Sequence, residues 1–151
     1  MAIKRIIFCL GSNIGDRQNY LDLAVKELQE NLELQKIKIS SVLENKALLL
    51  DGAPKEWDMD FYNIAVSADI NCEKFEPLAI LKITQQIEIN LGKVKRGKWS
   101  PREIDIDIAA IEDLRIDLGE ILKIPHIGIF QRDFFLKTIM EIEPEILNKI
   151  R

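Results

Sequence analysis

Two aspartates placed two positions apart are the most distinctive chemical feature of the sequence. Asp105 and Asp107 alternate with isoleucines within residues 104–111. Side chains of a β-strand alternate between its two faces, so both carboxylates are expected on one face, ~6–7 Å apart at Cα, with the isoleucines facing the core. Such a pair can hold one Mg²⁺ or bridge two, and proteins usually bind magnesium through one or two carboxylates plus substrate phosphates.

Alternation alone favours a simpler interpretation, the solvent-exposed face of an amphipathic strand. Asp is disfavoured in strands, however, and two like charges on one face repel each other. Residues 92–102, immediately before the pair, contain five bases, no acid and Trp99. Acids for metal, bases for phosphate oxygens and a flat ring for stacking are the parts of a magnesium–polyphosphate site. A solvated charged loop stays an alternative for the basic residues.

Other reactive residue types point to less specific chemistry. His126 is the single histidine and lies six positions before Arg132, which leaves a structural and a functional role equally open. Cys9 and Cys72 stand in apolar surroundings, which predicts buried, reduced thiols. The sequence has no P-loop motif, and Gly11-Ser12-Asn13 is too short for a dinucleotide fingerprint, so it predicts a tight turn.

Composition limits the class of protein. The 151 residues, 47% hydrophobic and 30% charged, indicate one globular domain and exclude disorder. No apolar run approaches the ~20 residues that span a bilayer, and the run at residues 6–10 is too short for a signal peptide, so we expect a cytoplasmic protein. The net charge is −4, and the chain outside residues 92–102 carries 16 bases and 25 acids. A basic segment on an acidic protein indicates a small anionic ligand in place of nucleic acid.

Apolar periodicity predicts the elements that must position these residues. Strands are expected at residues 4–10, 37–43, 61–70 and 104–111, with a short one at 114–117. Helices are expected from a cap at Asp16 to residue 32, at 78–91 with Gly92 as C-terminal cap, and at 134–142 and 143–150. Residues 45–60 form a long loop. The order β-α-β-β-α-β with a C-terminal helical addition predicts an α+β, ferredoxin-like sheet with helices on one face, a fold that does not by itself define function.

Taken in order, five motifs resemble the 6-hydroxymethyl-7,8-dihydropterin pyrophosphokinase family of folate biosynthesis. They are Gly11-Ser12-Asn13, Asn63, Trp99-Ser100-Pro101-Arg102, Asp105-Ile106-Asp107, and Pro125-His126 with Arg132. Each motif is weak alone, but the ordered set is specific and extends from about residue 6 to residue 144.

The resemblance implies transfer of the terminal diphosphate of ATP to the hydroxymethyl group of a reduced pterin, leaving AMP, with two Mg²⁺ ions held by Asp105 and Asp107. It implies catalytic roles for these two acids and for Lys95 and Arg102. The implied ATP contacts are Gln85, Glu88, Lys95, Trp99, Arg102, Ile108, His126 and Arg132. The implied pterin contacts are Ala47, Leu48, Phe61, Asn63, Trp99, Asp105 and Phe134. Asn63 would bond the pterin edge and Phe134 would stack on its ring.

The chain also departs from the family pattern. Thr-x-Pro-x-Gly is frequent after the second strand, where this chain has Asn45-Lys46-Ala47-Leu48-Leu49-Leu50. Lys93 and Lys95 stand where Arg is frequent, and lysine keeps the charge but lacks the bidentate fork. Ser100 replaces a common Gly. Residues 45–60 and 92–99 are the loops expected to close over the site.

Two other hypotheses stay open on the sequence. Only Phe61, Asn63 and Phe134 argue for a pterin, so another Mg²⁺-dependent phosphoryl or nucleotidyl transferase with a different acceptor is the main alternative. An RNA-binding ferredoxin-like module would need aromatic residues on central strands in a basic field. We expect a single domain over residues 1–151 that acts on small molecules without nucleic acid or membrane. In this family, such a domain is sometimes fused to dihydropteroate synthase.

Overall fold

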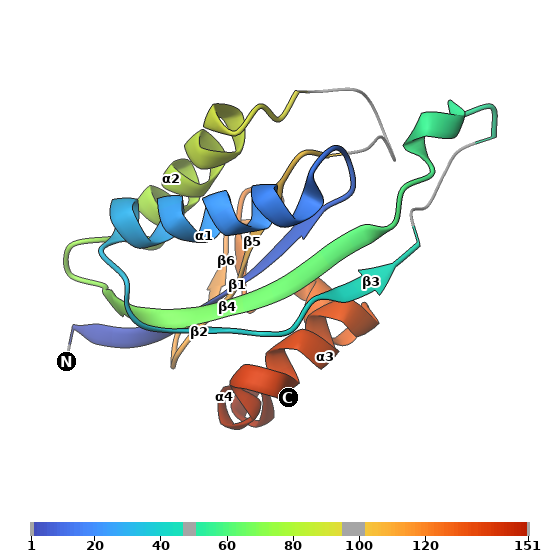
Figure 1. Ribbon diagram of the computed structural model, residues 1–151. Helices are drawn as coiled ribbons and strands as arrows, with labels where there is room; N and C mark the ends of the chain where they lie inside the picture. The colour runs from blue at the N-terminus through green and yellow to red at the C-terminus, as the bar shows by residue number, and fades with distance from the viewer. Residues whose placement is uncertain (1, 47–50, 95–101, 151) are drawn as a thin grey trace.

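The computed structural model describes residues 2–46, 51–94 and 102–150. Figure 1 shows its elements, which in chain order are β1 (Ile3–Ser12), α1 (Arg17–Leu32), β2 (Gln35–Ile39), β3 (Leu43–Asn45), a 3₁₀ turn η1 (Lys55–Trp57), β4 (Phe61–Asn71), α2 (Pro77–Asn90), β5 (Asp105–Ile111), β6 (Ile116–Asp117), β7 (Lys123–Ile124), a 3₁₀ turn η2 (Ile127–Phe130), α3 (Asp133–Ile142) and α4 (Pro144–Ile150).

The main sheet has the strand order β2-β4-β1-β5, and β3 also pairs with β4. Every one of these pairs is antiparallel. Strands β6 and β7 form a separate two-stranded ribbon, which is also antiparallel. The structure therefore confirms a mixed α/β protein built on an antiparallel sheet. Strands β1 and β4 are central, and β5, which carries the two aspartates, lies at an edge.

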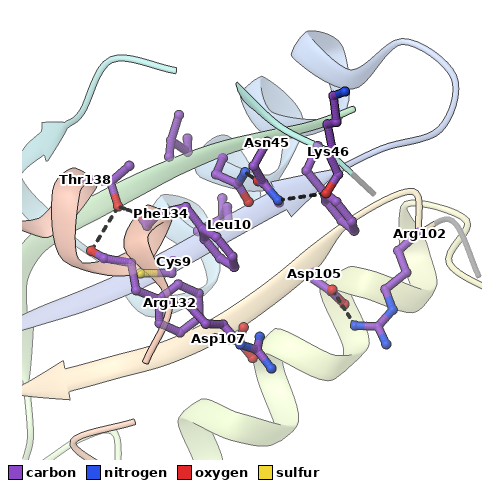
Figure 2. A pocket seen from close by; sticks show the side chains of 15 residues that line it. Cys9, Leu10, Asn45, Lys46, Arg102, Asp105, Asp107, Arg132, Phe134 and Thr138 are labelled. Atoms are coloured by element: carbon purple, nitrogen blue, oxygen red, sulfur yellow. Dashed lines mark hydrogen bonds and ion pairs between the residues drawn. The ribbon is translucent and has the colours of Figure 1, made fainter. Parts of the chain in front are cut away.

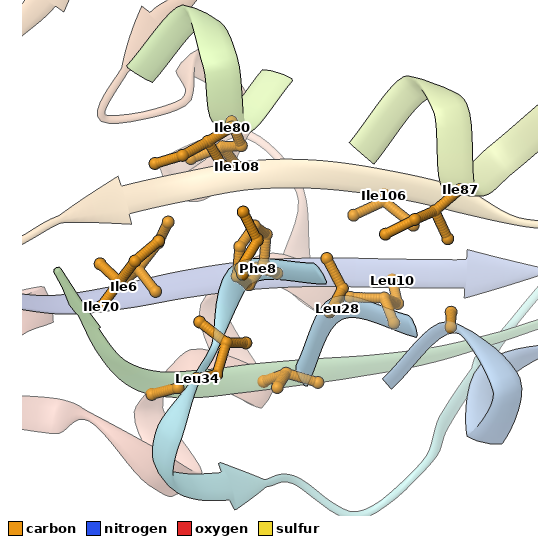
Figure 3. Close-up of a cluster of buried hydrophobic side chains, with 14 of the residues drawn as sticks. Ile6, Phe8, Leu10, Leu28, Leu34, Ile70, Ile80, Ile87, Ile106 and Ile108 are labelled. Carbon is orange, nitrogen blue, oxygen red and sulfur yellow. The ribbon is translucent and has the colours of Figure 1, made fainter. Parts of the chain in front are cut away.

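Helices cover both faces of the sheet. Figure 1 shows α1 and α2 on one side and α3 and α4 on the other. The larger core lies between the sheet and α1 and α2, and in Figure 3 it contains Phe8 of β1, Leu28 of α1 and Ile80 of α2. The second core joins Ile7 to Ile139 and its neighbours on α3 and α4. Both faces of β1 are buried, which explains its continuous apolar run.

The predicted helix boundaries follow local chemistry. The Asp16 carboxylate accepts a hydrogen bond from the Asn19 N–H at 3.1 Å, which confirms the expected cap of α1. Helix α2 begins at Pro77, whose missing N–H costs nothing at this position. Gly92 follows α2 with φ of 99°, a left-handed conformation that glycine adopts without strain. No helix within the described ranges is both long and apolar enough to cross a bilayer.

The prediction of a single strand at residues 37–43 is wrong, because β2 ends at Ile39 and β3 begins at Leu43. Between them the chain turns towards α3, where the backbone N–H and hydroxyl of Ser41 both donate to the Glu141 carboxylate at 3.0 Å. The pairing register of β2 also shifts after Gln35, which alternation of apolar residues does not reveal.

Three smaller expectations also need correction. The loop at residues 45–60 contains η1, and β3 reaches Asn45. The short strand expected at 114–117 is limited to β6 and pairs with β7, which was not predicted. Cys9 is buried as expected, but Cys72 is only partly buried because it follows the end of β4.

Candidate active site

The pairing register aligns residues of β4, β1 and β5 in rows across the sheet, and two of these rows end at the aspartates of β5. Asp105 lies opposite Gly11, which lies opposite Asn63, and Asp107 lies opposite Cys9 in the next row. The intervening Ile106 belongs to the core under α1 and α2, which confirms the predicted alternation of β5. Both carboxylates therefore face the side of the sheet that α3 covers.

A cavity of about 340 Å³ lies over these rows (Figure 2). Its lining residues are Cys9, Leu10, Gly11, Asn45, Lys46, Phe61, Asn63, Ile64, Arg102, Asp105, Asp107, Arg132, Phe134, Phe135 and Thr138. One part of the wall is thus charged, and the other is aromatic with two amide side chains. This combination suits a ligand with a flat apolar ring, a polar rim and an anionic portion.

Asp105 is held by two cations. Lys93 Nζ lies 2.7 Å from its Oδ1 atom, and an Nη1 atom of Arg102 lies 2.6 Å from its Oδ2 atom. Lys93 also pairs with Glu88 at 3.2 Å. Burial lowers the pKa of Lys93 and of Arg102, but the neighbouring carboxylates, Asp105 first, outweigh burial and raise both pKa values. Both side chains are therefore positively charged beside the acid pair.

Asp107 has a different environment. Burial and the nearby Asp105 charge raise the pKa of Asp107 to about 6, while the Arg132 cation acts in the opposite direction. His126 Nε2 lies 3.8 Å from the Asp107 Oδ1 atom, and His126 Nδ1 accepts a hydrogen bond from the Gly128 N–H at 2.8 Å. Burial and Arg132 lower the pKa of His126, so the imidazole is neutral at pH 7.

Glu88 supports the backbone between the two aspartates. Its Oε2 atom accepts a hydrogen bond from the Ile106 N–H at 2.7 Å, and burial raises the pKa of the Glu88 carboxyl. Because β5 is an edge strand, this donor has no strand partner on its outer side within the part of the chain that the structure describes. The helix α2 thus completes the hydrogen bonding of β5 at the acid pair.

Asn13 forms hydrogen bonds with two loop residues beside the cavity, Arg102 and Met59. Its backbone N–H donates to the Arg102 carbonyl at 3.1 Å, and its side-chain Oδ1 accepts from the Arg102 N–H at 2.7 Å. Its Nδ2 atom donates to the Met59 carbonyl at 3.4 Å. The buried amide therefore positions the backbone from which the Arg102 guanidinium extends to Asp105.

A family model described as 7,8-dihydro-6-hydroxymethylpterin-pyrophosphokinase matches residues 7–144. The chain belongs to this pyrophosphokinase family. A 2-amino-4-hydroxy-6-hydroxymethyldihydropteridine pyrophosphokinase from Aquifex aeolicus is 37% identical over 141 residues, which cover 93% of this chain and 81% of that protein. The resemblance of the ordered motifs to the family is therefore confirmed.

Other similar proteins are longer. A folate synthesis bifunctional protein from Chlamydia caviae is 41% identical over 92% of this chain, which spans 30% of that protein. A solved Plasmodium falciparum HPPK-DHPS structure with pteroate has a TM-score of 0.64 and 18% identity over 95% of this chain, which spans 39% of that chain. The second similarity supports the fold alone.

The site residues expected from the sequence fall into four groups, of which the last, Gln85 and Ile108, lies away from the cavity. The cavity brings together Phe61, Asn63, Arg102, Asp105, Asp107, Arg132 and Phe134. Glu88 and His126 lie behind this lining, and the His126 ring contacts Phe135 edge-on at 5.1 Å between centroids. Lys95, Trp99, Ala47 and Leu48 lie outside the described residues.

Two expected ATP contacts lie away from the cavity. Gln85 is exposed on α2, and Ile108 is buried in the core on the opposite face of the sheet. Neither side chain lines the cavity, and the contacts of Gln85 and Ile108 with ATP stay predictions. Ile108 follows the same alternation that turns Asp107 towards α3.

Several lining residues were not among the predicted site residues. Cys9 and Thr138 lie beside Asp107 and Phe134, and Asn45, Lys46 and Phe135 complete the wall. Alternation along β1 would have suggested Cys9. Thr138 lies four positions after Phe134, so the helical period would have suggested that both face the same side. Lys93 belongs to the basic segment, but its contacts with Glu88 and Asp105 depend on tertiary structure.

The acid pair fits a magnesium site. Among the described residues, no three His, Cys, Asp or Glu side chains are grouped so that they would hold a metal without other ligands. Asp105 and Asp107 instead offer two hard oxygen donors on one face of a strand, beside an open cavity. Magnesium commonly uses such a pair and completes its coordination with water and phosphate oxygens.

Proposed function

We propose that this cavity is where the chain transfers the terminal diphosphate of ATP to the hydroxymethyl group of 6-hydroxymethyl-7,8-dihydropterin, leaving AMP. Family membership supplies the reaction class, an ATP-dependent diphosphate transfer in folate biosynthesis. One observation carries the assignment of the site. Asp105 and Asp107 face the same cavity as Phe61, Phe134 and Asn63.

The aromatic part of the cavity suits the pterin. Phe61 of β4 and Phe134 of α3 offer apolar faces to a flat heterocycle, and Asn63 offers an amide at its rim. Gly11 keeps the floor open, because a Cβ atom there would lie 3.0 Å from Asn63 Oδ1 and 3.5 Å from Phe61 Cδ1. Pterin contacts from Ala47, Leu48 and Trp99 are part of the same proposal on the strength of the family resemblance.

The charged part of the cavity suits the polyphosphate of ATP. Asp105 and Asp107 would hold Mg²⁺, which we propose as two ions and which would neutralise charge on the phosphates when bound. Lys93, Arg102 and Arg132 place positive charge on either side of these acids. Cations in these positions can bind phosphate oxygens as charge-assisted hydrogen-bond donors.

Catalysis in this site rests on alignment and charge neutralisation, as is usual for phosphoryl-type transfer. Asn13 and Glu88 hold the backbone of Arg102 and Ile106, so the acids and the Arg102 guanidinium keep a fixed relationship. His126 is neutral and offers a polar group without adding charge. The assignment needs no dedicated side-chain base for the hydroxymethyl group.

The wider organisation is part of the proposal. The strand order β2-β4-β1-β5 with antiparallel pairs supports a ferredoxin-like sheet. The family match over residues 7–144 supports one domain across residues 1–151. We place the reaction in the cytoplasm, where ATP is supplied. The family resemblance and a bifunctional folate-synthesis relative support an association with dihydropteroate synthase.

Formation of AMP tests the proposed reaction. Purified protein is incubated with ATP and Mg²⁺, with and without 6-hydroxymethyl-7,8-dihydropterin, and nucleotides are separated by chromatography. We expect AMP only when the pterin is present and none after EDTA treatment. ADP as product, or AMP formed equally without the pterin, would contradict the assignment of acceptor and transferred group.

A further inference from the structure

We infer that Asn45 is a positioning residue that fixes the orientation of the Asn63 amide and thereby selects the hydrogen-bond-donating edge of the pterin. The inference rests on the proposed function. Asn45 is the last residue of β3. Asn45 and Asn63 line the cavity together, and Figure 2 shows Asn45 next to Lys46.

The two amides form a chain of hydrogen bonds with one direction. Asn45 Nδ2 donates to the Lys46 carbonyl at 3.3 Å, so its Oδ1 atom is the end that accepts. Asn63 Nδ2 donates to that Oδ1 atom and also to the Leu43 carbonyl at 3.2 Å. An amide nitrogen has two hydrogens, and these two acceptors use both of them.

The acceptor end of Asn63 is therefore the end left for a ligand. Its Oδ1 atom lies above Gly11, 3.0 Å from the point that a Cβ atom would occupy there. Asn63 is 4% exposed, and within the described part of the chain its Oδ1 atom accepts no hydrogen bond. An acceptor that lines the cavity without a partner favours a ligand that brings a donor. The 2-amino group and neighbouring ring N–H of a pterin are such donors.

Reversal of either amide would be unfavourable. If Asn63 turned over, its oxygen would face the Leu43 carbonyl and the Asn45 oxygen, and three acceptors would meet without a hydrogen between them. If Asn45 turned over, its oxygen would face the Lys46 carbonyl and its two hydrogens would face those of Asn63. The backbone carbonyls of residues 43 and 46 thus set both orientations. Without Asn45, the Leu43 carbonyl is the one acceptor left for Asn63 Nδ2 among the described residues.

Substitution of Asn45 tests this inference through substrate selectivity. The variants are Asn45→Ala, which removes the acceptor, and Asn45→Asp, which keeps an acceptor for Asn63 Nδ2. Asn31→Ala on the exposed side of α1 is the control, because it also removes an amide with local hydrogen bonds. The acceptors are 6-hydroxymethyl-7,8-dihydropterin and its analogue without the 2-amino group, and kcat/KM for AMP formation is measured for each.

We expect wild-type protein to prefer the pterin over the 2-deamino analogue by at least about tenfold. In Asn45→Ala this ratio should fall by about fivefold, because Asn63 can then present its Nδ2 group to the analogue. Asn45→Asp and Asn31→Ala should keep the wild-type ratio within about twofold, and KM for ATP should change little in all variants. The ratio does not depend on the fraction of folded enzyme, so loss of stability alone cannot produce the expected change.

Failure of the inference is distinguishable from failure of the proposed function. If wild-type protein forms AMP in a pterin-dependent reaction and Asn45→Ala keeps the full selectivity ratio, Asn45 does not orient Asn63 and the inference is wrong. An equal loss of selectivity in Asn45→Asp would also contradict it, because the acceptor is retained there. If wild-type protein forms no AMP with the pterin, the proposed function is wrong and the inference falls with it.

Discussion

Replacing Asp107 by Asn should make the metal-free protein more stable while it removes activity. The Asp107 carboxyl has a pKa of about 6 in the folded protein, against 3.8 for an unperturbed aspartate, because of burial and then the Asp105 charge. Its ionised form is therefore less favourable in the folded state than in the unfolded chain. Asparagine has nearly the same shape and no charge, so it removes this penalty.

The size and pH dependence of the effect follow from these two pKa values. Protonated Asp107 makes its full contribution to the stability of the folded protein below pH 3.8, and this contribution is lost as pH rises to about 6. At pH 8 the folded protein therefore carries the complete cost of the ionised carboxylate. About 40% of the Asp107 side chain is exposed, and solvent screening reduces the penalty to about 1 kcal/mol. In a domain of this size, that corresponds to a rise in Tm of about 2–4 °C. At pH 5 the difference should be about half as large.

Urea unfolding of both proteins in EDTA, at pH 5 and pH 8, measures this difference directly. Comparing wild type with Asp107→Asn at each pH cancels the contribution of other carboxylates. In a parallel assay, turnover of the variant should fall by more than about a hundredfold, since a proposed metal ligand is lost. A variant that is less stable than wild type at pH 8 would refute the reasoning. So would a stability difference that is larger at pH 5 than at pH 8.

Two further substitutions test the supporting structure of the site. Gly11→Ala should change the free energy of unfolding by less than about 1 kcal/mol, because alanine suits a strand better than glycine, yet weaken pterin binding, because its Cβ atom would lie 3.0 Å from Asn63 Oδ1. Urea unfolding and a calorimetric titration separate the two effects, and unchanged affinity would contradict the proposed position of the pterin. Glu88→Ala should lose about 1–3 kcal/mol of stability and most activity, because the Ile106 N–H loses its acceptor, whereas Glu88→Gln keeps an acceptor and should retain most of the stability. Equal stability losses in the two Glu88 variants, measured by urea unfolding, would show that the carboxylate charge matters more than this hydrogen bond.

The sequence was sufficient for the parts of the fold that depend on local periodicity. Alternation along β5 predicted that Asp105 and Asp107 share a face, because a strand has one periodicity and its isoleucines need burial. The cap of α1 at Asp16 and the glycine that follows α2, Gly92, were also predictable, because both depend on residue types next to the helix ends. The division of the second strand was not, because it depends on hydrogen bonds between Ser41 and Glu141, which lie 100 positions apart.

The candidate site was predictable in its residue types and only partly in its geometry. Arg132 and Phe134 line the cavity because α3 packs on the face opposite α1 and α2, and apolar periodicity does not show which face a helix will cover. Lys93 was noted only as part of a basic segment, yet it connects Glu88 to Asp105. Asn45 could not be assigned, because its proposed effect passes through Asn63 on a neighbouring strand.

The acid pair illustrates how tertiary structure makes two equivalent residues different. Asp105 already has Lys93 and Arg102 within 3 Å of its oxygens, so its charge is neutralised before any ligand binds. Among the described residues, Asp107 has only the neutral His126 within ion-pair distance, and burial together with the Asp105 charge raises its pKa to about 6. A divalent cation therefore gains most from Asp107, while Asp105 must share its oxygens with the two resident cations. Because Lys93 and Arg102 are also the groups expected to meet phosphate, binding of the polyphosphate and of the metal should favour each other: an anion that draws the cations away leaves Asp105 free to act as a ligand.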